Sequence, residues 1–202
     1  VPEDEYLGIA LGGLTKGVSP MEMASAYTTF ANKGVRAKGR FVTKIIDATG
    51  AVIVDNTTPQ TNKVTSESVA DKMTSMLLTV YAPGGGGANA APAGYTIAGK
   101  TGTTETVNGE DGARDQWMIG YTPDMVVATW MGYDDSAKYS LAVSSTHGVG
   151  PLFQLEMYGL LRTSSKNTPF SVAPAATAEK KDSSLNVDEI IQKAEETGKQ
   201  IW

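Results

Sequence analysis

Hydrophobic residues spaced three and four positions apart predict a first helix that begins near Ser19. Ser19 can cap this helix, Pro20 suits its first turn, and Glu22 completes a capping box with Ser19. Gly34 supplies the stop signal. The apolar face predicted for this helix consists of Met23, Tyr27, Phe30 and Ala31.

Two further helices follow from the same spacing. One begins near Ser66, and the other runs from Gly150 to Leu161. The stripe predicted for the helix after Ser66 is Val69, Met73, Met76, Leu77 and Val80. The closing helix is rich in large apolar residues, which are Leu152, Phe153, Leu155, Met157, Leu160 and Leu161.

Runs of β-branched and aromatic residues between turn signals predict strands and two hairpins. The expected strands lie near 41–47, 51–55, 95–104, 115–121 and 125–133. The first hairpin turns at Ala48-Thr49-Gly50 and the second at Thr122-Pro123-Asp124, whereas residues 82–94 are too poor in large apolar side chains for a core element. The sequence therefore predicts an α/β (α+β) fold, in which helices flank an antiparallel sheet.

The composition changes after about Arg162, which predicts the domain boundaries. Residues 1–162 are expected to be one globular unit. Residues 163–185 are rich in Ser, Thr, Ala, Pro and Lys and are expected to be a linker. Residues 186–202 are expected to form a short C-terminal helix or tail that Asn186 could cap.

Composition and charge exclude several classes of function. The 202-residue chain has a net charge of −5 with scattered Lys and Arg, so no nucleic-acid partner is expected. It has no cysteine and one histidine, His147, which exclude disulfides and thiolate or histidine-rich metal sites. No cofactor or metal is therefore expected. No run of about 18 apolar residues occurs.

The stretch GYTIAGKTGTT, residues 94–104, fits two different motifs. Gly94–Thr101 matches the phosphate-binding loop pattern G-x-x-x-x-G-K-[ST], which needs a buried strand before it and a helix after it. Four glycines and Ala-Ala-Pro-Ala precede Gly94, and a threonine- and glycine-rich run follows Thr101, so neither element is expected. A nucleotide-binding loop remains a distant alternative.

The same letters contain KTGT, which suits a strand at the edge of a substrate cleft. Lys100 provides a cation for a carboxylate or a proton relay. Gly102 lets a substrate approach the strand closely, and the hydroxyls of Thr101 and Thr103 can bind a substrate carboxylate. The Thr103 N–H can help to stabilise an oxyanion. We therefore predict Lys100 and Thr103 as catalytic residues and Lys100, Thr101, Gly102 and Thr103 as substrate-binding residues.

The order of these segments resembles the transpeptidase domain of bifunctional (class A) penicillin-binding proteins. LGGLTKGVSPMEMASAYTTFANKGV, the first hairpin, AGKTGTT and DQWMIGYTPDMVVATWMGYDD match it in order over roughly residues 5–162. The resemblance implies a penicillin-binding transpeptidase fold, similar to serine β-lactamases. It also implies an enzyme that attacks the D-Ala-D-Ala end of a peptidoglycan stem peptide through a serine, passes the acyl group to an amine and is acylated by β-lactam antibiotics. Lys100, Thr101, Gly102 and Thr103 are the matching residues.

Two motifs of that family are absent. No serine has a lysine three residues later, so the S-x-x-K nucleophile motif is missing. Ser165-Lys166-Asn167 and Ser184-Leu185-Asn186 match S-x-N only by letter, and after KTGT rather than before it. Because acyl transfer depends on the covalent step, we interpret residues 1–162 as the C-terminal half of a transpeptidase domain whose nucleophile and S-x-N motif lie outside this chain.

The expected partners are the upstream half of the same protein, peptidoglycan stem peptides and β-lactams. The expected location is the outer face of the bacterial cell membrane, with an anchor outside this chain. The alternative is a binding or regulatory module that keeps the cleft without the chemistry.

Overall fold

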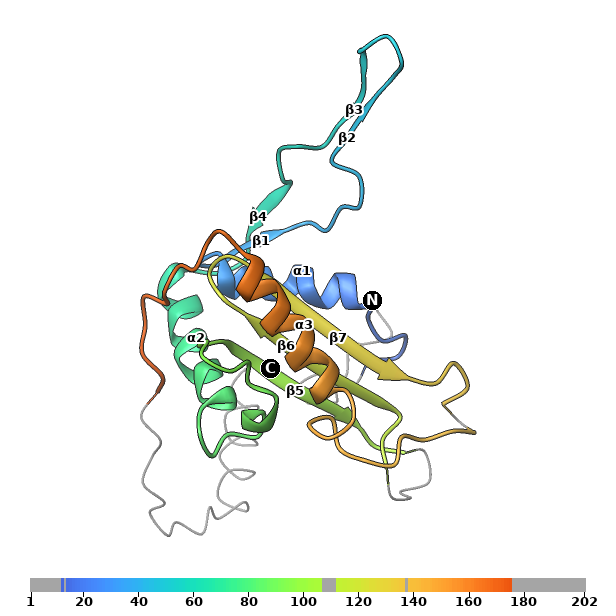
Figure 1. Ribbon diagram of the computed structural model, residues 1–202, viewed down its shortest axis with the longest axis vertical. Coiled ribbons are helices and arrows are strands. Elements are labelled where there is room, and N and C mark those ends of the chain that lie inside the picture. The colour runs from blue at the N-terminus through green and yellow to red at the C-terminus, as the bar shows by residue number, and fades with distance from the viewer. Residues whose placement is uncertain (1–11, 13, 107–111, 137, 176–202) are drawn as a thin grey trace, which may run out of the picture.

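The computed structural model describes residues 12, 14–106, 112–136 and 138–175, which form helices and strands around a small central sheet (Figure 1). The elements in chain order are α1 (Pro20–Ala31), β1 (Val35–Ala37), β2 (Lys44–Ile46), β3 (Val52–Asp55), β4 (Thr61–Lys63), α2 (Glu67–Tyr81), the 3₁₀ turn η3 (Ala88–Ala90), β5 (Ala98–Thr104), β6 (Asp115–Tyr121), β7 (Val126–Gly132) and α3 (Gly150–Thr163). The predicted C-terminal helix or tail, 186–202, lies outside the described residues.

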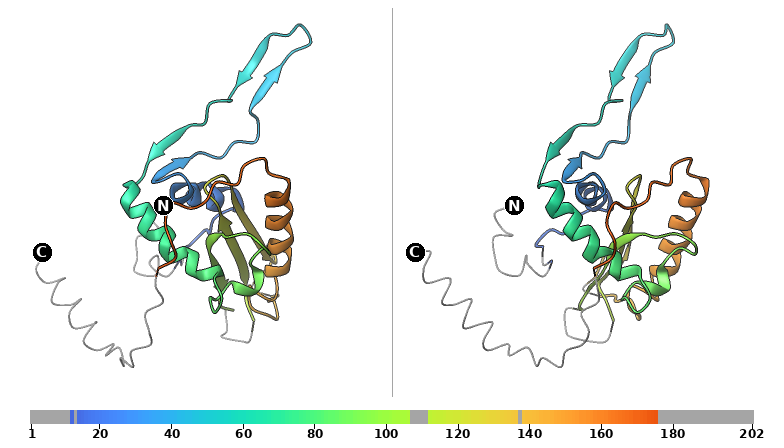
Figure 2. Two further views of the ribbon diagram at one scale, coloured as in Figure 1. Left: turned by 60° about the vertical axis from the view of Figure 1, so that its left-hand side comes forward. Right: turned by 90° about the vertical axis from the view of Figure 1, so that its left-hand side faces the viewer.

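The central sheet has three antiparallel strands in the order β5-β6-β7. Helices α1 and α2 lie on one side of this sheet and α3 on the other, as the views of Figure 2 show. Phe153, Met157 and Leu161 of α3 pack with Met118 of β6 in one core cluster. The predicted class, an antiparallel sheet flanked by helices, is confirmed.

Helix α1 begins as the sequence predicts. The Ser19 hydroxyl accepts a hydrogen bond from the Glu22 N–H at 3.3 Å, and the Glu22 carboxylate accepts one from the Ser19 N–H at 2.8 Å. The Ser19 N–H holds the pKa of Glu22 below its usual value. Tyr27 and Phe30 of this helix pack against Tyr121 of β6, which confirms that part of the predicted apolar face.

The predicted buried stripe of α2 is wrong in part. Val69 and Met76 are exposed. The residues that this helix buries are Ala70, Thr74, Leu77, Leu78 and Tyr81. The polar residue Thr74 belongs to the buried face because its hydroxyl meets the Tyr121 phenol, and apolar spacing alone cannot indicate such a contact.

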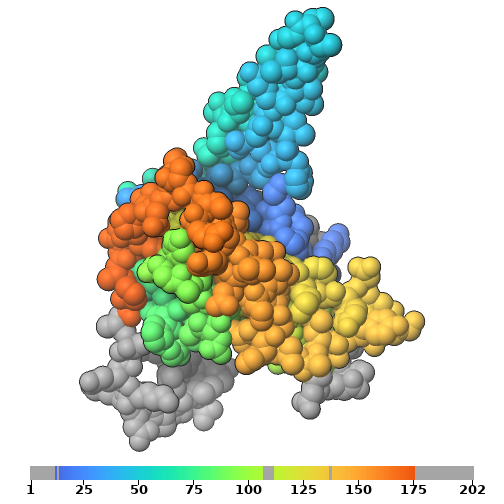
Figure 3. All heavy atoms as spheres, in the orientation of Figure 1, coloured from blue at the N-terminus to red at the C-terminus, as the bar shows by residue number. Residues whose placement is uncertain are grey.

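The first hairpin forms where it was predicted, but it is a separate two-stranded sheet of β2 and β3. It projects from the body of the molecule (Figures 1 and 3). Asp47 shapes its turn by accepting hydrogen bonds from the N–H groups of Thr49 and Ala51, and Gly50 has a φ of 88°. The pair β1–β4 at the base of the hairpin was not predicted.

The first part of the predicted linker contacts the body of the molecule. Thr168 donates two hydrogen bonds to Asp124, and Phe170 packs edge-on against Tyr121. The Ala175 N–H donates to the Ser75 carbonyl at 2.8 Å, and the Ser75 hydroxyl donates to the Ala173 carbonyl at 2.6 Å. Thr163 is the last residue of α3, and residues 164–175 form a strap across the body. A linker over 176–185, which lie outside the described residues, stays a prediction.

Candidate active site

The four predicted site residues lie together inside β5. Lys100, Thr101, Gly102 and Thr103 occupy its third to sixth positions, and β5 is an edge strand among the described residues. No helix begins at Lys100, because the strand continues to Thr104. The phosphate-loop alternative is therefore wrong, since that loop needs a helix N-terminus at its Lys-Thr.

A hydrogen bond at the last residue of β5 indicates which way the peptide groups of this strand point. The Thr104 carbonyl accepts a hydrogen bond from the Arg114 N–H, next to β6, at 2.9 Å. Peptide groups alternate in direction along a strand, so the Gly102 carbonyl also points towards β6. The Thr103 N–H belongs to the same peptide group as that carbonyl and points the opposite way, to the free edge of β5.

The Lys100 ammonium also lies at this free edge. Its Nζ donates to the Thr101 carbonyl at 2.9 Å, and the side chain is exposed. Within the part of the chain that the structure describes, no carboxylate forms an ion pair with Lys100. A cation without a counter-ion, next to a backbone donor, can bind an anionic group of a ligand.

Gly102 has a structural role that the sequence did not indicate. It lies opposite Trp117 in the β5–β6 register. A Cβ at this position would lie 3.2 Å from the Trp117 Cβ, which is tighter than an ordinary contact. The glycine therefore leaves room for Trp117, in addition to keeping this part of the strand free for a ligand.

Thr103 contacts a buried serine that sequence reasoning did not select. Its Oγ1 lies 2.5 Å from the Oγ of Ser145, which also donates to the Gly102 carbonyl at 2.5 Å. Ser145 lies in the loop between β7 and α3, within the run Ser144-Ser145-Thr146-His147. No local pattern distinguishes Ser145 from its neighbour Ser144, so only the folded chain reveals its contact with β5.

The Ser165–Asn167 run does not join the site, and the Ser144 and His147 side chains pair with each other rather than with the KTGT residues. Asn167 lines a hollow together with Tyr95 and Thr122, beside the start of β5, whereas Thr103 lies near its end. The Ser144 hydroxyl meets His147 Nδ1 at 3.0 Å within one exposed turn. The run 184–186 lies outside the described residues.

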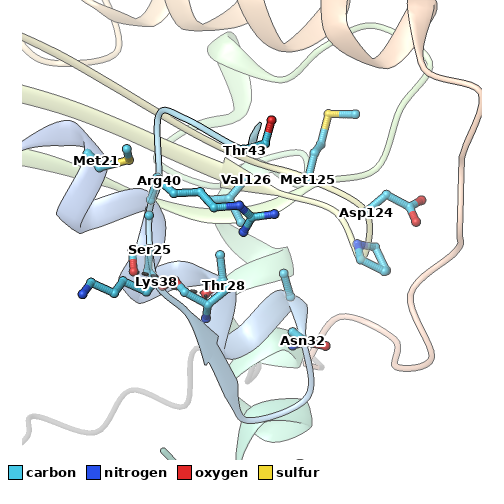
Figure 4. Close-up of a pocket in the computed structure, with 15 residues that line it drawn as sticks. Met21, Ser25, Thr28, Asn32, Lys38, Arg40, Thr43, Asp124, Met125 and Val126 are labelled. Atoms are coloured by element: carbon cyan, nitrogen blue, oxygen red, sulfur yellow. Dashed lines mark hydrogen bonds between the residues drawn. The ribbon is translucent and has the colours of Figure 1, made fainter. Parts of the chain in front are cut away.

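A separate groove of about 560 Å³ lies between α1 and the turn that joins β6 to β7 (Figure 4). Met21, Ser25, Thr28, Lys38, Arg40 and Asp124 are among its lining residues. Tyr121 is the last residue of β6 before this turn, and it pairs with Ala98, the first residue of β5. The turn therefore lies next to the start of β5. None of the four predicted site residues lines the groove.

The described residues contain neither a candidate metal site nor a candidate membrane span. Within the described ranges 12, 14–106, 112–136 and 138–175, no three or more His, Cys, Asp or Glu side chains come together in a way that could hold a metal ion. None of the helices in the same ranges is long and apolar enough to cross a lipid bilayer.

Comparisons with known proteins all match the same family. The family model for the penicillin binding protein transpeptidase domain matches residues 3–148. Penicillin-binding protein 2a of Streptococcus pneumoniae is 42% identical over 152 residues, which cover 75% of this chain and 20% of that protein. Penicillin-binding protein 1F of Bacillus subtilis is 40% identical over 146 residues, which cover 70% of this chain and 20% of that protein.

A solved structure has a similar fold. PonA1 of Mycobacterium tuberculosis in complex with penicillin V aligns with a TM-score of 0.68 and 29% sequence identity, over 85% of this chain and 46% of that chain. The chain thus spans about a fifth of the length of the curated relatives that it matches.

Proposed function

Because this chain belongs to the penicillin-binding protein transpeptidase domain family, we propose that it is the C-terminal half of the D,D-transpeptidase domain of a class A penicillin-binding protein. Such a protein cross-links peptidoglycan stem peptides through an acyl-serine. The observation that carries the proposal is the KTGT segment in the edge strand of the described sheet, with the exposed Lys100 ammonium at that edge. The alternation of peptide groups directs the Thr103 N–H to the same edge.

In this proposal each residue of the edge has a defined role. The Lys100 cation attracts the carboxylate of the D-Ala-D-Ala terminus and supports the proton relay of the nucleophile. The hydroxyls of Thr101 and Thr103 bind that carboxylate, and Gly102 lets the peptide approach the strand. The Thr103 N–H stabilises the oxyanion of the tetrahedral intermediate. The chemistry is ordinary acyl transfer, for which these residues need no cofactor.

The nucleophile belongs to the upstream half of the same protein. That half supplies the serine of S-x-x-K, its lysine base and the S-x-N motif, and it completes the cleft against the free edge of β5. The length of the curated relatives supports a larger protein, because this chain spans about a fifth of them. The expected location is the outer face of the cell membrane, with an anchor outside residues 1–202.

Labelling with a fluorescent penicillin tests this function. The full-length protein should form one covalent adduct, and mass spectrometry should place the acyl group on a serine upstream of residue 1. Residues 1–202 alone should form none. An acyl-serine within residues 1–202, or a full-length protein that is never labelled, would contradict the proposal. The second outcome, with S-x-x-K also absent upstream, would favour a binding module that keeps the cleft without the chemistry.

A further inference from the structure

Ser145 is a polar residue in the core with a contact to the proposed substrate edge. Its side chain is 2% exposed, and its Oγ lies 2.5 Å from both the Gly102 carbonyl oxygen and Thr103 Oγ1. A buried hydroxyl needs hydrogen-bond partners, and both of these belong to consecutive residues of β5. Ser145 therefore connects the β7–α3 loop directly to the strand that carries KTGT.

The direction of these hydrogen bonds follows from counting protons. The Gly102 carbonyl can only accept, so the single Ser145 proton points to it. The contact between the two hydroxyls must then use the Thr103 proton, which points to Ser145. In the resting protein the chain of donors runs from Thr103 to Ser145 to the Gly102 carbonyl, and the free lone pairs of Thr103 remain for a ligand.

A carboxylate ligand needs the opposite direction, because it accepts hydrogen bonds and donates none. Both hydroxyls can turn about their C–O bonds. Once the Thr103 proton points to the carboxylate, the Ser145 proton can point to Thr103 Oγ1 instead of the Gly102 carbonyl. Donation from Ser145 then polarises the Thr103 hydroxyl and makes it a stronger donor.

The position of Ser145 is held by Gln116, which lies opposite Thr103 in the β5–β6 register. The Gln116 amide donates to the Val143 carbonyl, and its oxygen accepts from the Val149 N–H at 3.0 Å. Gly148 leaves room for this side chain, since a Cβ there would lie 1.9 Å from the Gln116 oxygen. The loop of residues 143–149 is thereby fastened to the sheet on both sides of Ser145.

We propose that Ser145 is a positioning residue, which fixes the Thr103 oxygen at the strand edge and donates to it when a carboxylate binds. This inference rests on the proposed function, because it concerns ligand binding at the same edge. Ser145 itself does not contact the ligand and acts only through Thr103. Its loss should therefore weaken acylation only where the Thr103 hydroxyl is present.

The test is a double-mutant cycle on acylation of the full-length protein by a penicillin. Ser145→Ala and the nearly isosteric Ser145→Cys should each lower the second-order acylation constant about three- to tenfold, the effect of one hydrogen bond. Thr103→Val should lower it as well, and adding either serine substitution to Thr103→Val should change it no further. The matched control is Ser144→Ala, whose exposed hydroxyl bonds only within its own turn and whose loss should have no effect.

Each outcome of the cycle has a defined meaning. If the Ser145 substitutions lowered the acylation constant equally in wild type and in Thr103→Val, Ser145 would be a general structural residue and the proposal would be overturned. Failure of both Ser145 variants to fold would overturn it as well. No change in either serine variant would overturn it too. Absence of acylation in the wild-type protein would contradict the proposed function instead, so the two failures are distinguishable.

Discussion

The hydroxyl of Thr74 and the phenol oxygen of Tyr121 lie 2.9 Å apart in the core, where they join α2 to β6. Both side chains are buried, and burial raises the pKa of Tyr121 to about 12. The pair stands where α1, α2 and the strap all meet the sheet, because Tyr27, Phe30 and Phe170 surround the same tyrosine ring.

The Thr74–Tyr121 pair predicts a non-additive effect on stability. In the full-length protein, Thr74→Val should lower the free energy of unfolding of the transpeptidase domain by about 1–3 kcal/mol, because it leaves the Tyr121 hydroxyl buried without its partner. Adding Tyr121→Phe should recover part of this loss, since both polar groups are then gone. Urea unfolding of the four proteins measures the cycle, and strictly additive losses would contradict the pairing.

Lys100 should matter for acylation more than any other exposed lysine of the chain. Lys100→Ala in the full-length protein should reduce the rate of acylation by a β-lactam about 10²- to 10³-fold, as for the loss of one electrostatic group at a reacting centre. Lys72→Ala, on the exposed side of α2, is the matched control and should leave the rate unchanged. Stopped-flow kinetics give both constants, and a Lys100→Ala rate within threefold of wild type would disprove the assignment.

Gly99, directly before Lys100, should tolerate no side chain. A Cβ at Gly99 would lie 1.9 Å from the Ile119 carbonyl oxygen, which is backbone and cannot turn aside. Gly99→Ala should therefore disrupt the β5–β6 pairing and lower the melting temperature by at least several degrees. Gly159→Ala on α3 is the control: a Cβ there meets nothing within 4 Å, and alanine favours a helix. Equal melting temperatures for the two variants would be the contrary result.

The attachment of the strap should depend on pH. Asp124 accepts from the Thr168 N–H at 2.7 Å and from its hydroxyl at 2.9 Å, and the Thr168 N–H holds the pKa of Asp124 below its usual value. A lowered folded-state pKa stabilises the fold above the unfolded-state value of about 3.9. That contribution is lost as the pH falls through the folded-state pKa.

Hydrogen exchange can follow this attachment. After correction for intrinsic rates, the Thr168 amide should exchange faster in Asp124→Ala than in wild type at neutral pH, and wild type should approach the variant progressively as the pH falls below the unfolded-state value of about 3.9. Asp135→Ala is the control, because the Asp135 carboxylate forms its ion pair with Lys138 in an exposed turn away from the strap. Unchanged protection of Thr168 in Asp124→Ala would show that other contacts hold the strap.

Local signals in the sequence were sufficient for the elements that carry the site. The capping box of Ser19 and Glu22 fixes the start of α1, and the two turns fix the hairpins. Strand β5 was predicted from Tyr95, whereas it begins at Ala98, just after the turn at Gly94 with its φ of 81°. The four residues of the candidate site fall within the predicted strand, because half of its ten residues are β-branched, which favours an extended chain.

What the sequence did not indicate depends on contacts between distant residues. The strands β1 and β4 are three residues long and mostly polar, so only their pairing, such as Val35 with Lys63, defines them. The buried face of α2 includes Thr74 because of Tyr121, which is 47 positions away. Ser145 is separated from Thr103 by 42 positions, and nothing in its own neighbourhood indicates that contact.

The tendency of this chain to precipitate should depend mainly on the projecting hairpin. Phe41 is 90% exposed and Ile53 62% exposed, and both edges of the two-stranded sheet are unpaired among the described strands. An apolar ribbon with open edges is the type of surface through which copies of a chain precipitate. Replacing Phe41 and Ile53 with Ser and Thr should therefore raise the concentration at which a preparation begins to scatter light, while the sheet that carries Lys100 stays unchanged.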